Sequence, residues 1–175
     1  MLDTLLEVGE LIRGYGGSDA WLTWRPAARW RLDVGAASQA VETFYALHHH
    51  LHFEQASLSA EWRCARRWTL GARGNAADYS DGNEKLKGAA RLTWKREGRW
   101  EIHAGPVVTY MDFANPYPGG YWAPAWVRNG SFETTVKTRT GRWTWRLNGS
   151  LGLEKERGGD AVTVGGVSLR AGWRL

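Results

Sequence analysis

The sequence predicts an all-β fold, an antiparallel up-and-down transmembrane β-barrel with about ten strands in this chain, which is either a barrel by itself or part of a larger one. Three observations lead to this prediction. Apolar and polar residues alternate through most of the chain, which is typical of strands with one face turned away from water. Trp residues flank short basic turns. Short connections at one end of the predicted sheet are matched by longer, irregular connections at the other end, as in membrane barrels.

The basic turns are each bracketed by Trp residues. Segments 24–30, 62–68 and 94–100 begin and end with Trp, and segment 137–143 keeps only the trailing Arg-Trp. A row of Trp at one height, with cations just beyond it, is the aromatic girdle of a membrane barrel. We therefore predict a single ring at the membrane interface, made of Trp24, Trp30, Trp62, Trp68, Trp94, Trp100, Trp143 and Trp173.

Alternation indicates nine strands along the chain. They are 19–25, 29–38, 54–63, 67–77, 84–95, 99–111, 129–138, 142–154 and 161–174. Residues 1–18 are ambiguous, because the apolar residues that follow Asp3 fit either a strand at about 3–12 or a short capped helix. We favour the strand, since an odd number of strands is hard to close and an open edge in lipid is costly. The whole chain, 1–175, is predicted to be a single β-barrel domain.

The faces of these strands differ in chemistry. In segment 84–95, for example, Leu86, Ala90 and Trp94 share one face, and Lys85 and Arg91 lie on the other. The charged face is expected to line the lumen. The predicted lumen-lining residues are Arg31, Arg73, Lys85, Lys87, Arg91, Glu101, Glu133, Arg146 and Arg170. Two interpretations remain open: cross-strand ion pairs that fill a narrow barrel, or a mildly cationic path for anionic or neutral solutes.

Composition excludes several classes of protein. The net charge is +5, but the basic residues alternate with apolar ones instead of clustering, so we predict no nucleic-acid partner. The single cysteine, Cys64, excludes an internal disulfide framework. No apolar stretch of about 18 residues predicts a membrane-spanning helix. The first residues do not resemble a secretory signal, so we expect the chain to be a mature fragment or the C-terminal part of a longer protein.

The predicted loops contain the remaining candidate site residues. His48, His49, His50 and His52 form a cluster near segment 39–53, but they lack the spacing and companion ligands of a defined metal site, so no metal is assigned. Ser80 beside Asp78 and Asp81 is the nearest approach to a catalytic set, and it fits a turn better. We therefore predict no enzyme activity and no cofactor.

The long loop 112–128 is rich in Pro, Gly and aromatic residues. Long ordered loops are usually functional, so we expect this one to fold over or into the barrel mouth. Its candidates for contact with sugar rings are Tyr121, Trp122 and Trp126. A self-packed cap without a ligand is the alternative that we weigh equally.

Two loop motifs suggest a family. The segment Asp78-Tyr79-Ser80-Asp81-Gly82-Asn83 introduces one strand, and Gly120-Tyr121-Trp122-Ala123-Pro124, followed by Arg128, introduces another. Together they resemble the C-terminal barrels of bacterial exopolysaccharide export porins, namely the poly-N-acetylglucosamine porin and the cellulose synthase outer-membrane subunit. The resemblance covers about residues 60–175. Barrels of that family have about sixteen strands and follow helical tetratricopeptide repeats.

The resemblance implies a passive barrel in the bacterial outer membrane that forms part of an exopolysaccharide export porin. Its implied partners are the lipid bilayer, an exopolysaccharide and the barrel-assembly machinery. Two alternatives stay open: a small structural or adhesion-type barrel with a plugged lumen, and a soluble glycan-binding β protein whose exposed Trp residues stack on sugars.

Overall fold

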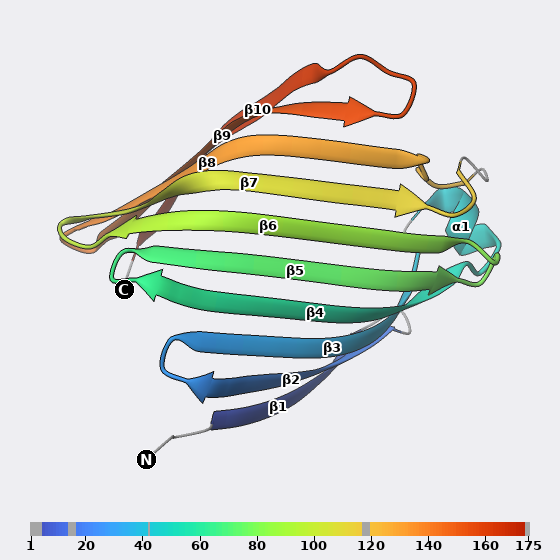
Figure 1. The fold of residues 1–175 in the computed structure, drawn as a ribbon, viewed down its shortest axis with the longest axis horizontal. Helices are drawn as coiled ribbons and strands as arrows, with labels where there is room; N and C mark the ends of the chain where they lie inside the picture. The colour runs from blue at the N-terminus through green and yellow to red at the C-terminus, as the bar shows by residue number, and fades with distance from the viewer. Residues whose placement is uncertain (1–4, 14–16, 42, 117–119, 174–175) are drawn as a thin grey trace.

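Ten antiparallel strands follow one another in a single sheet, in the same order as in the sequence (Figure 1). The structure is a computed structural model that describes residues 5–13, 17–41, 43–116 and 120–173. The strands are β1 Leu5–Arg13, β2 Gly17–Ala27, β3 Trp30–Ala40, β4 His52–Ala65, β5 Trp68–Tyr79, β6 Glu84–Arg96, β7 Trp100–Phe113, β8 Trp126–Thr140, β9 Trp143–Glu156 and β10 Val162–Trp173. The predicted all-β, up-and-down antiparallel fold is confirmed.

The ambiguous N-terminal segment contains a strand. β1 pairs along its full described length with β2, from Leu5 opposite Arg25 to Arg13 opposite Gly17. Residues 3 and 4 of the predicted strand lie outside the described residues, as does residue 174 at the end of the last predicted strand.

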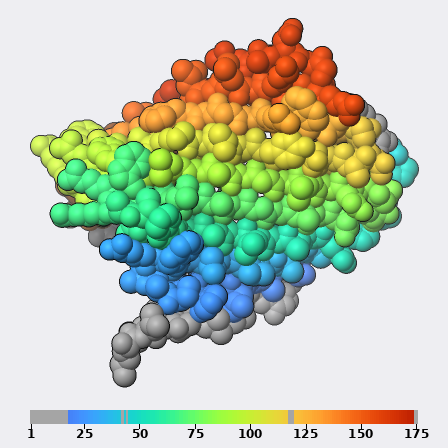
Figure 2. Space-filling view, in the orientation of Figure 1, coloured from blue at the N-terminus to red at the C-terminus, as the bar shows by residue number. Residues whose placement is uncertain are grey.

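The sheet is twisted and curved, and β9 and β10 slope steeply across the direction of β4 to β7 (Figure 1). Within the described residues, β1 pairs only with β2, and β10 pairs only with β9. No pairing between β1 and β10 is present among the described residues, so these two strands are the edges of the sheet. In the space-filling view the strands lie side by side in colour order as one continuous surface (Figure 2).

The connections differ in length at the two ends of the sheet. At one end, residues 28–29, 66–67, 97–99 and 141–142 form the turns that link strands. At the other end lie the longer connections 41–51, 80–83, 114–125 and 157–161. The first of these contains a short helix, α1 Phe44–His48, which the sequence analysis treats as loop. Thr43 caps it, because its Oγ1 atom accepts a hydrogen bond from the Ala46 amide at 3.1 Å.

Proline residues coincide with breaks in the strand pairing. The register of β2 against β3 shifts between Trp24 and Ala27, around Pro26. In β7, Pro106 has no amide hydrogen to donate, and the pairing with β6 is interrupted between the Arg91–Val107 and Trp94–Ala104 pairs. A Cβ atom at the adjoining Gly105 would collide with the Leu92 carbonyl oxygen, so only glycine fits this close approach.

The sheet has almost no hydrophobic core. Among the described side chains the buried hydrophobic residues are Ala46, Ala77, Phe113, Ala123 and Val127. Large apolar side chains are exposed instead, for example Val167 at 79%, Leu151 at 65% and Leu169 at 64% of their surface. No helix among the described residues is both long enough and apolar enough to cross a membrane.

Candidate functional site

The Trp residues of the predicted ring all lie near the end of the sheet that has the short turns. In the strand register Trp30 is opposite Trp62, Trp68 is opposite Trp94, and Trp143 is opposite Trp173. The Trp30 and Trp62 rings stack with centroids 5.6 Å apart, and the Trp143 and Trp173 rings meet edge to face at 4.8 Å. The spacing suits a belt of rings along one edge of the apolar face, and its place at a membrane interface remains a prediction.

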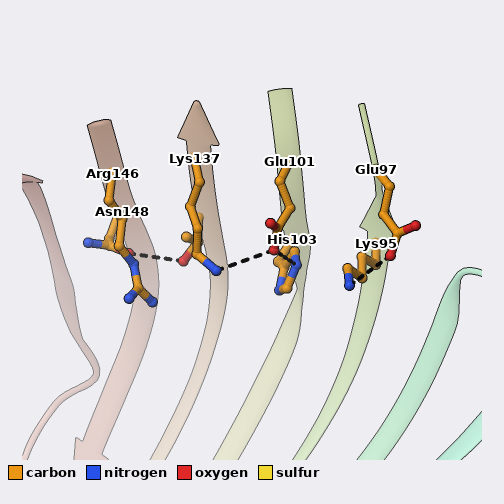
Figure 3. Close-up of polar contacts among 8 residues, drawn as sticks. Lys95, Glu97, Glu101, His103, Lys137, Arg146 and Asn148 are labelled. Atoms are coloured by element: carbon orange, nitrogen blue, oxygen red, sulfur yellow. Dashed lines mark hydrogen bonds and ion pairs between the residues drawn. The ribbon is translucent and has the colours of Figure 1, made fainter. Parts of the chain in front are cut away.

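A polar network lies on the opposite face near the same end (Figure 3). The Glu101 Oε1 atom of β7 is 3.2 Å from Lys137 Nζ of β8 and 2.7 Å from His103 Nε2 on its own strand. The His103 Nε2 atom is buried and, within the described part of the chain, has no hydrogen-bond partner of suitable geometry. At the neighbouring turn, Lys95 Nζ is 2.9 Å from Glu97 Oε1.

The network continues through Asn148 to the last strand. The Asn148 Oδ1 atom accepts hydrogen bonds from Thr135 Oγ1 of β8 at 3.0 Å and from Arg146 Nε of β9 at 3.2 Å. Its Nδ2 atom donates to Ser168 Oγ of β10 at 3.1 Å. One amide side chain therefore ties three adjacent strands together on the polar face, which fixes their register.

Two further ion pairs lie on this face. Arg91 of β6 reaches across β7 to Glu133 of β8, with 3.2 Å between Nη2 and Oε2. Arg31 Nε is 3.0 Å from Asp33 Oδ1 on β3. Exposed pairs of this kind contribute little to stability, typically about 0–1 kcal/mol, so they neutralise charge more than they hold the sheet together.

The other predicted lumen-lining residues share this face but differ in their partners. Lys85 Nζ lies over the Phe53 and Tyr79 rings, 5.2 and 5.6 Å from their centroids. Arg170 stands opposite Arg146 in the register of β9 and β10. Arg73 and Lys87 form no ion pair among the described residues. The structure thus places all nine predicted lumen-lining residues on the face opposite the Trp ring, and their role in a lumen remains a prediction.

Asn83 organises the loops at the other end of the sheet. Its side chain is 2% exposed and satisfies four groups at once. The Nδ2 atom donates to the Asn115 carbonyl oxygen at 3.0 Å and to the Tyr121 hydroxyl at 2.9 Å. The Oδ1 atom accepts from the amides of Asn115 at 2.9 Å and Glu84 at 3.0 Å. The β5–β6 turn and the long loop are therefore joined through one buried amide.

Tyr121 fastens the second half of the long loop to the same turn. Its ring stacks on the Tyr79 ring with centroids 5.0 Å apart, and its hydroxyl donates to Asp81 Oδ2 at 3.0 Å. Burial, together with the carboxylate of Asp81, raises the pKa of Tyr121 to about 12. The adjacent Gly120 accepts a hydrogen bond from Thr43 Oγ1 at 2.6 Å, which joins the loop to the cap of α1. Residues 117–119 of the predicted loop lie outside the described residues.

The three sugar-contact candidates therefore differ in environment. The Tyr121 ring is engaged by Tyr79 and Phe113, whereas Trp122 is 58% exposed. Trp126 starts β8, and the Arg128 guanidinium lies 4.8 Å from its ring centroid. Of the three, Trp122 presents the most ring surface to solvent, and ligand binding by any of them remains a prediction.

The histidine cluster lies on α1 and the residues that follow it. The His48 and His49 rings meet edge to face at 5.3 Å, and the His49 ring lies 4.2 Å from the Tyr45 ring. Within the described part of the chain, no group of three or more His, Cys, Asp or Glu residues is arranged to hold a metal ion.

Sequence reasoning missed two residues of the site, Asn83 as the hub of the loops and Trp21 on the polar face. Trp21 is opposite Gly35, two residues from Thr23, whose Oγ1 atom donates to Asp33 at 2.6 Å. The spacing of two residues from Asp19 and Thr23 could have assigned Trp21 to that face. No comparable signal marked Asn83, because its partners come from a loop distant in sequence.

Comparison with known proteins identifies a fold. No protein-family model matches the chain, and no curated protein sequence matches it. A solved structure described as a bacterial polysaccharide outer membrane secretin is similar, with a TM-score of 0.73 and 15% sequence identity over 99% of this chain. This chain spans 64% of the length of that chain. At this identity the similarity establishes a shared fold.

Proposed function

We propose that this chain forms part of the wall of a passive β-barrel in the bacterial outer membrane, and that the barrel takes part in exporting an exopolysaccharide. It carries out no catalysis and needs no cofactor. The observation that supports the proposal is the contrast between the two faces of one sheet. One face is apolar and edged with Trp, and the other holds ion pairs and amide networks.

The exposed apolar face favours lipid over water as its surroundings. Leu151, Val167 and Leu169 are each more than 60% exposed, and they lie on the same face as the Trp ring. Burial of apolar area contributes about 25 cal/mol per Å², so a soluble protein would bury such a face in a core. Lipid provides that burial without a second layer of protein.

The length of the similar structure supports a wide lumen. Ten strands over 64% of that chain correspond to about sixteen strands over its whole length, if strands are spaced evenly. Barrels of about sixteen strands leave an aqueous channel, whereas barrels of about eight are filled by side chains. A barrel completed in this way would have room for a hydrated polymer, and it would also satisfy the edges of β1 and β10.

Two other candidate functions each have an observation in their favour. The ion pairs on the polar face fit a plugged structural or adhesion barrel, in which the loops act and the lumen does not. The exposed ring of Trp122 fits a soluble glycan-binding protein. The experiments below separate these candidates from the proposed function.

The first experiment tests for lipid around the apolar face. The protein is folded into vesicles that contain lipids brominated close to the headgroups, and Trp fluorescence is compared with unbrominated vesicles. We expect Trp30→Phe to remove part of the bromine quenching, because Trp30 lies on the apolar face. Trp21→Phe on the polar face is the matched control and should leave the absolute loss of fluorescence caused by bromine unchanged. Equal effects of the two substitutions would refute the membrane assignment.

The second experiment tests for an open path. The complete barrel that contains this chain is inserted into a planar bilayer, and the current through single barrels is recorded. A large and steady conductance is expected for an export barrel. A folded, lipid-inserted protein that passes no current would contradict the export function and favour the plugged structural barrel.

A further inference from the structure

A trough runs along the polar face from β2 towards β9. A hollow of about 350 Å³ lies among β2 to β6, and a second hollow of about 230 Å³ shares Ser59, Arg73 and Ala89 with it. A third hollow of about 330 Å³ shares Glu61, Arg91 and Glu133, among others, with the second. Because each hollow shares walls with the next, the three form one continuous depression across the sheet.

One row of residues that are opposite one another in the strand register lines the first hollow of this trough. The residues directly opposite one another on β2 to β6 are Trp21, Gly35, Ser57, Asn75 and Lys87. Gly35 and Ser57 are small, so they leave space beside the Trp21 indole ring. A Cβ atom at Gly35 would lie 2.9 Å from Ser57 Oγ and 3.8 Å from Trp21 Cβ, so a larger residue would fill the space. The Trp21 side chain is 41% exposed at the end of the row.

Some charged side chains of the trough have partners within the protein and others do not. Asp33 accepts hydrogen bonds from Thr23, Arg31 and Ser59. Glu133 is paired with Arg91. Lys87 of β6 is directly opposite Asn75 of β5, and Arg73 is two residues from Asn75 on β5. Arg73 and Lys87 are therefore diagonal neighbours on adjacent strands. Neither cation has a carboxylate partner within the described chain, so two positive charges are available to a ligand.

An unsatisfied acceptor lies between these charges. The Asn75 Oδ1 atom is buried and has no hydrogen-bond partner among the described residues. Buried polar atoms are usually paired, so a missing partner indicates a donor that the protein itself does not supply. A sugar hydroxyl is such a donor, and the exposed face of Trp21 is a surface on which a sugar ring can stack.

We propose that this trough binds anionic sugar units of the exported polysaccharide. Trp21 stacks on one ring, Asn75 accepts a hydrogen bond from a hydroxyl, and Arg73 and Lys87 pair with the acidic groups. The inference rests on the proposed function and adds the charge of the polymer. Trp21 and Lys87 are four strand spacings apart, about 19 Å, so several sugar units of one chain occupy the trough together.

The test measures binding of defined oligosaccharides to the protein folded in lipid nanodiscs. Three probes of equal length are titrated by calorimetry: an oligogalacturonate, a neutral cello-oligosaccharide and a cationic oligoglucosamine. We expect the oligogalacturonate to bind about tenfold more tightly than the neutral probe, with weaker binding as salt concentration rises. The galacturonate monosaccharide should bind far more weakly than the oligomer.

Substitutions assign the effect to the trough. The double variant Arg73→Gln/Lys87→Gln should reduce oligogalacturonate affinity about tenfold and leave the neutral probe unchanged. Arg139→Gln/Lys155→Gln removes the same charge away from the trough and is the matched control. Trp21→Leu should weaken both probes. Equal binding of all three probes, or an Arg73/Lys87 variant that behaves like its control, would overturn the inference.

The same preparation separates failure of this inference from failure of the proposed function. A protein that conducts in bilayers but binds no probe, or shows no preference for the anionic one, retains the export function and loses the anionic trough. A protein that is neither quenched by brominated lipid nor conducting loses both. A preference for oligoglucosamine would also overturn the inference, since it requires the opposite charge in the trough.

Discussion

Adjacent residues on β6 should respond in opposite ways to a change of charge. Ala90 lies on the apolar face between Ala72 and Val108, and Arg91 lies on the polar face, where it pairs with Glu133. We expect Ala90→Arg to impair folding into lipid, and Arg91→Ala to leave it nearly unchanged. The reason is that only the first substitution places a charge in hydrocarbon.

The structure sets the size of the difference. Ala90 is four residues from Trp94 of the predicted girdle, about 13 Å along the strand. For a strand tilted by about 40°, this is about 10 Å along the bilayer normal, close to the middle of an apolar band about 25 Å tall. An arginine there costs about 2–4 kcal/mol. The Arg91–Glu133 pair is about half exposed on both sides, so its loss costs at most about 1 kcal/mol.

The assay is equilibrium unfolding in urea from lipid vesicles, followed by Trp fluorescence. Ala89→Arg is the matched control, because it introduces the same side chain one residue away on the polar face. The free energy of unfolding should fall by about 2–4 kcal/mol for Ala90→Arg and by less than about 1 kcal/mol for the other two variants. Equal losses for Ala89→Arg and Ala90→Arg would refute the assignment of the two faces.

Three further predictions concern the loop cluster. Because the pKa of Tyr121 is raised to about 12 from an ordinary 10.0, the neutral hydroxyl is the favoured form in the folded loop. Its stabilising effect should be complete below about pH 10 and lost as pH rises through about 12. Tyr121→Phe should remove a tyrosine that ionises near pH 12 from an ultraviolet titration. Asn83→Ala should lower the free energy of unfolding in urea by about 1–3 kcal/mol, because it leaves the backbone amides of Glu84 and Asn115 without the acceptor they now have. Asn115→Ala is the control and should cost less, because its side chain donates to the Gly82 carbonyl oxygen at the longer distance of 3.4 Å. Gly120→Ala should increase protease cleavage of its loop more than Gly158→Ala does. Both glycines have a positive φ, but of the two only Gly120 would place a Cβ atom against a tyrosine ring, that of Tyr45. Equal cleavage of the two variants would contradict this packing.

The faces of the strands could be predicted from the sequence because alternation is a local property. A residue such as Arg91 is assigned by its position relative to Leu92, and the strand geometry then fixes the direction of its side chain. The basic turns between Trp residues likewise gave the positions of the hairpins, since turn and girdle lie within seven residues of each other. These parts of the fold depend on short-range order, and the sequence contains it explicitly.

The loop cluster and the trough could not be predicted in this way. Two partners of the Asn83 side chain, Asn115 and Tyr121, lie 32 and 38 residues away in the sequence, and no periodic pattern links them to Asn83. The trough depends on the register of five strands, which brings Trp21 into one row with Lys87. The helix α1 was not predicted from the sequence, because a helix of 5 residues is too short to show an apolar stripe.

The repeating hairpin has an evolutionary consequence. The pairs β2–β3, β4–β5 and β6–β7 each have a Trp on both sides of a short turn, one apolar face and one polar face. Each hairpin contains two antiparallel strands and its own turn. Duplicating or deleting one hairpin therefore leaves the neighbouring strands in the same orientation. Each such event would change the circumference by two strands, about 10 Å. In the proposed barrel, gain or loss of whole hairpins would therefore change the pore width in steps of two strands and leave the faces of the other strands as they are.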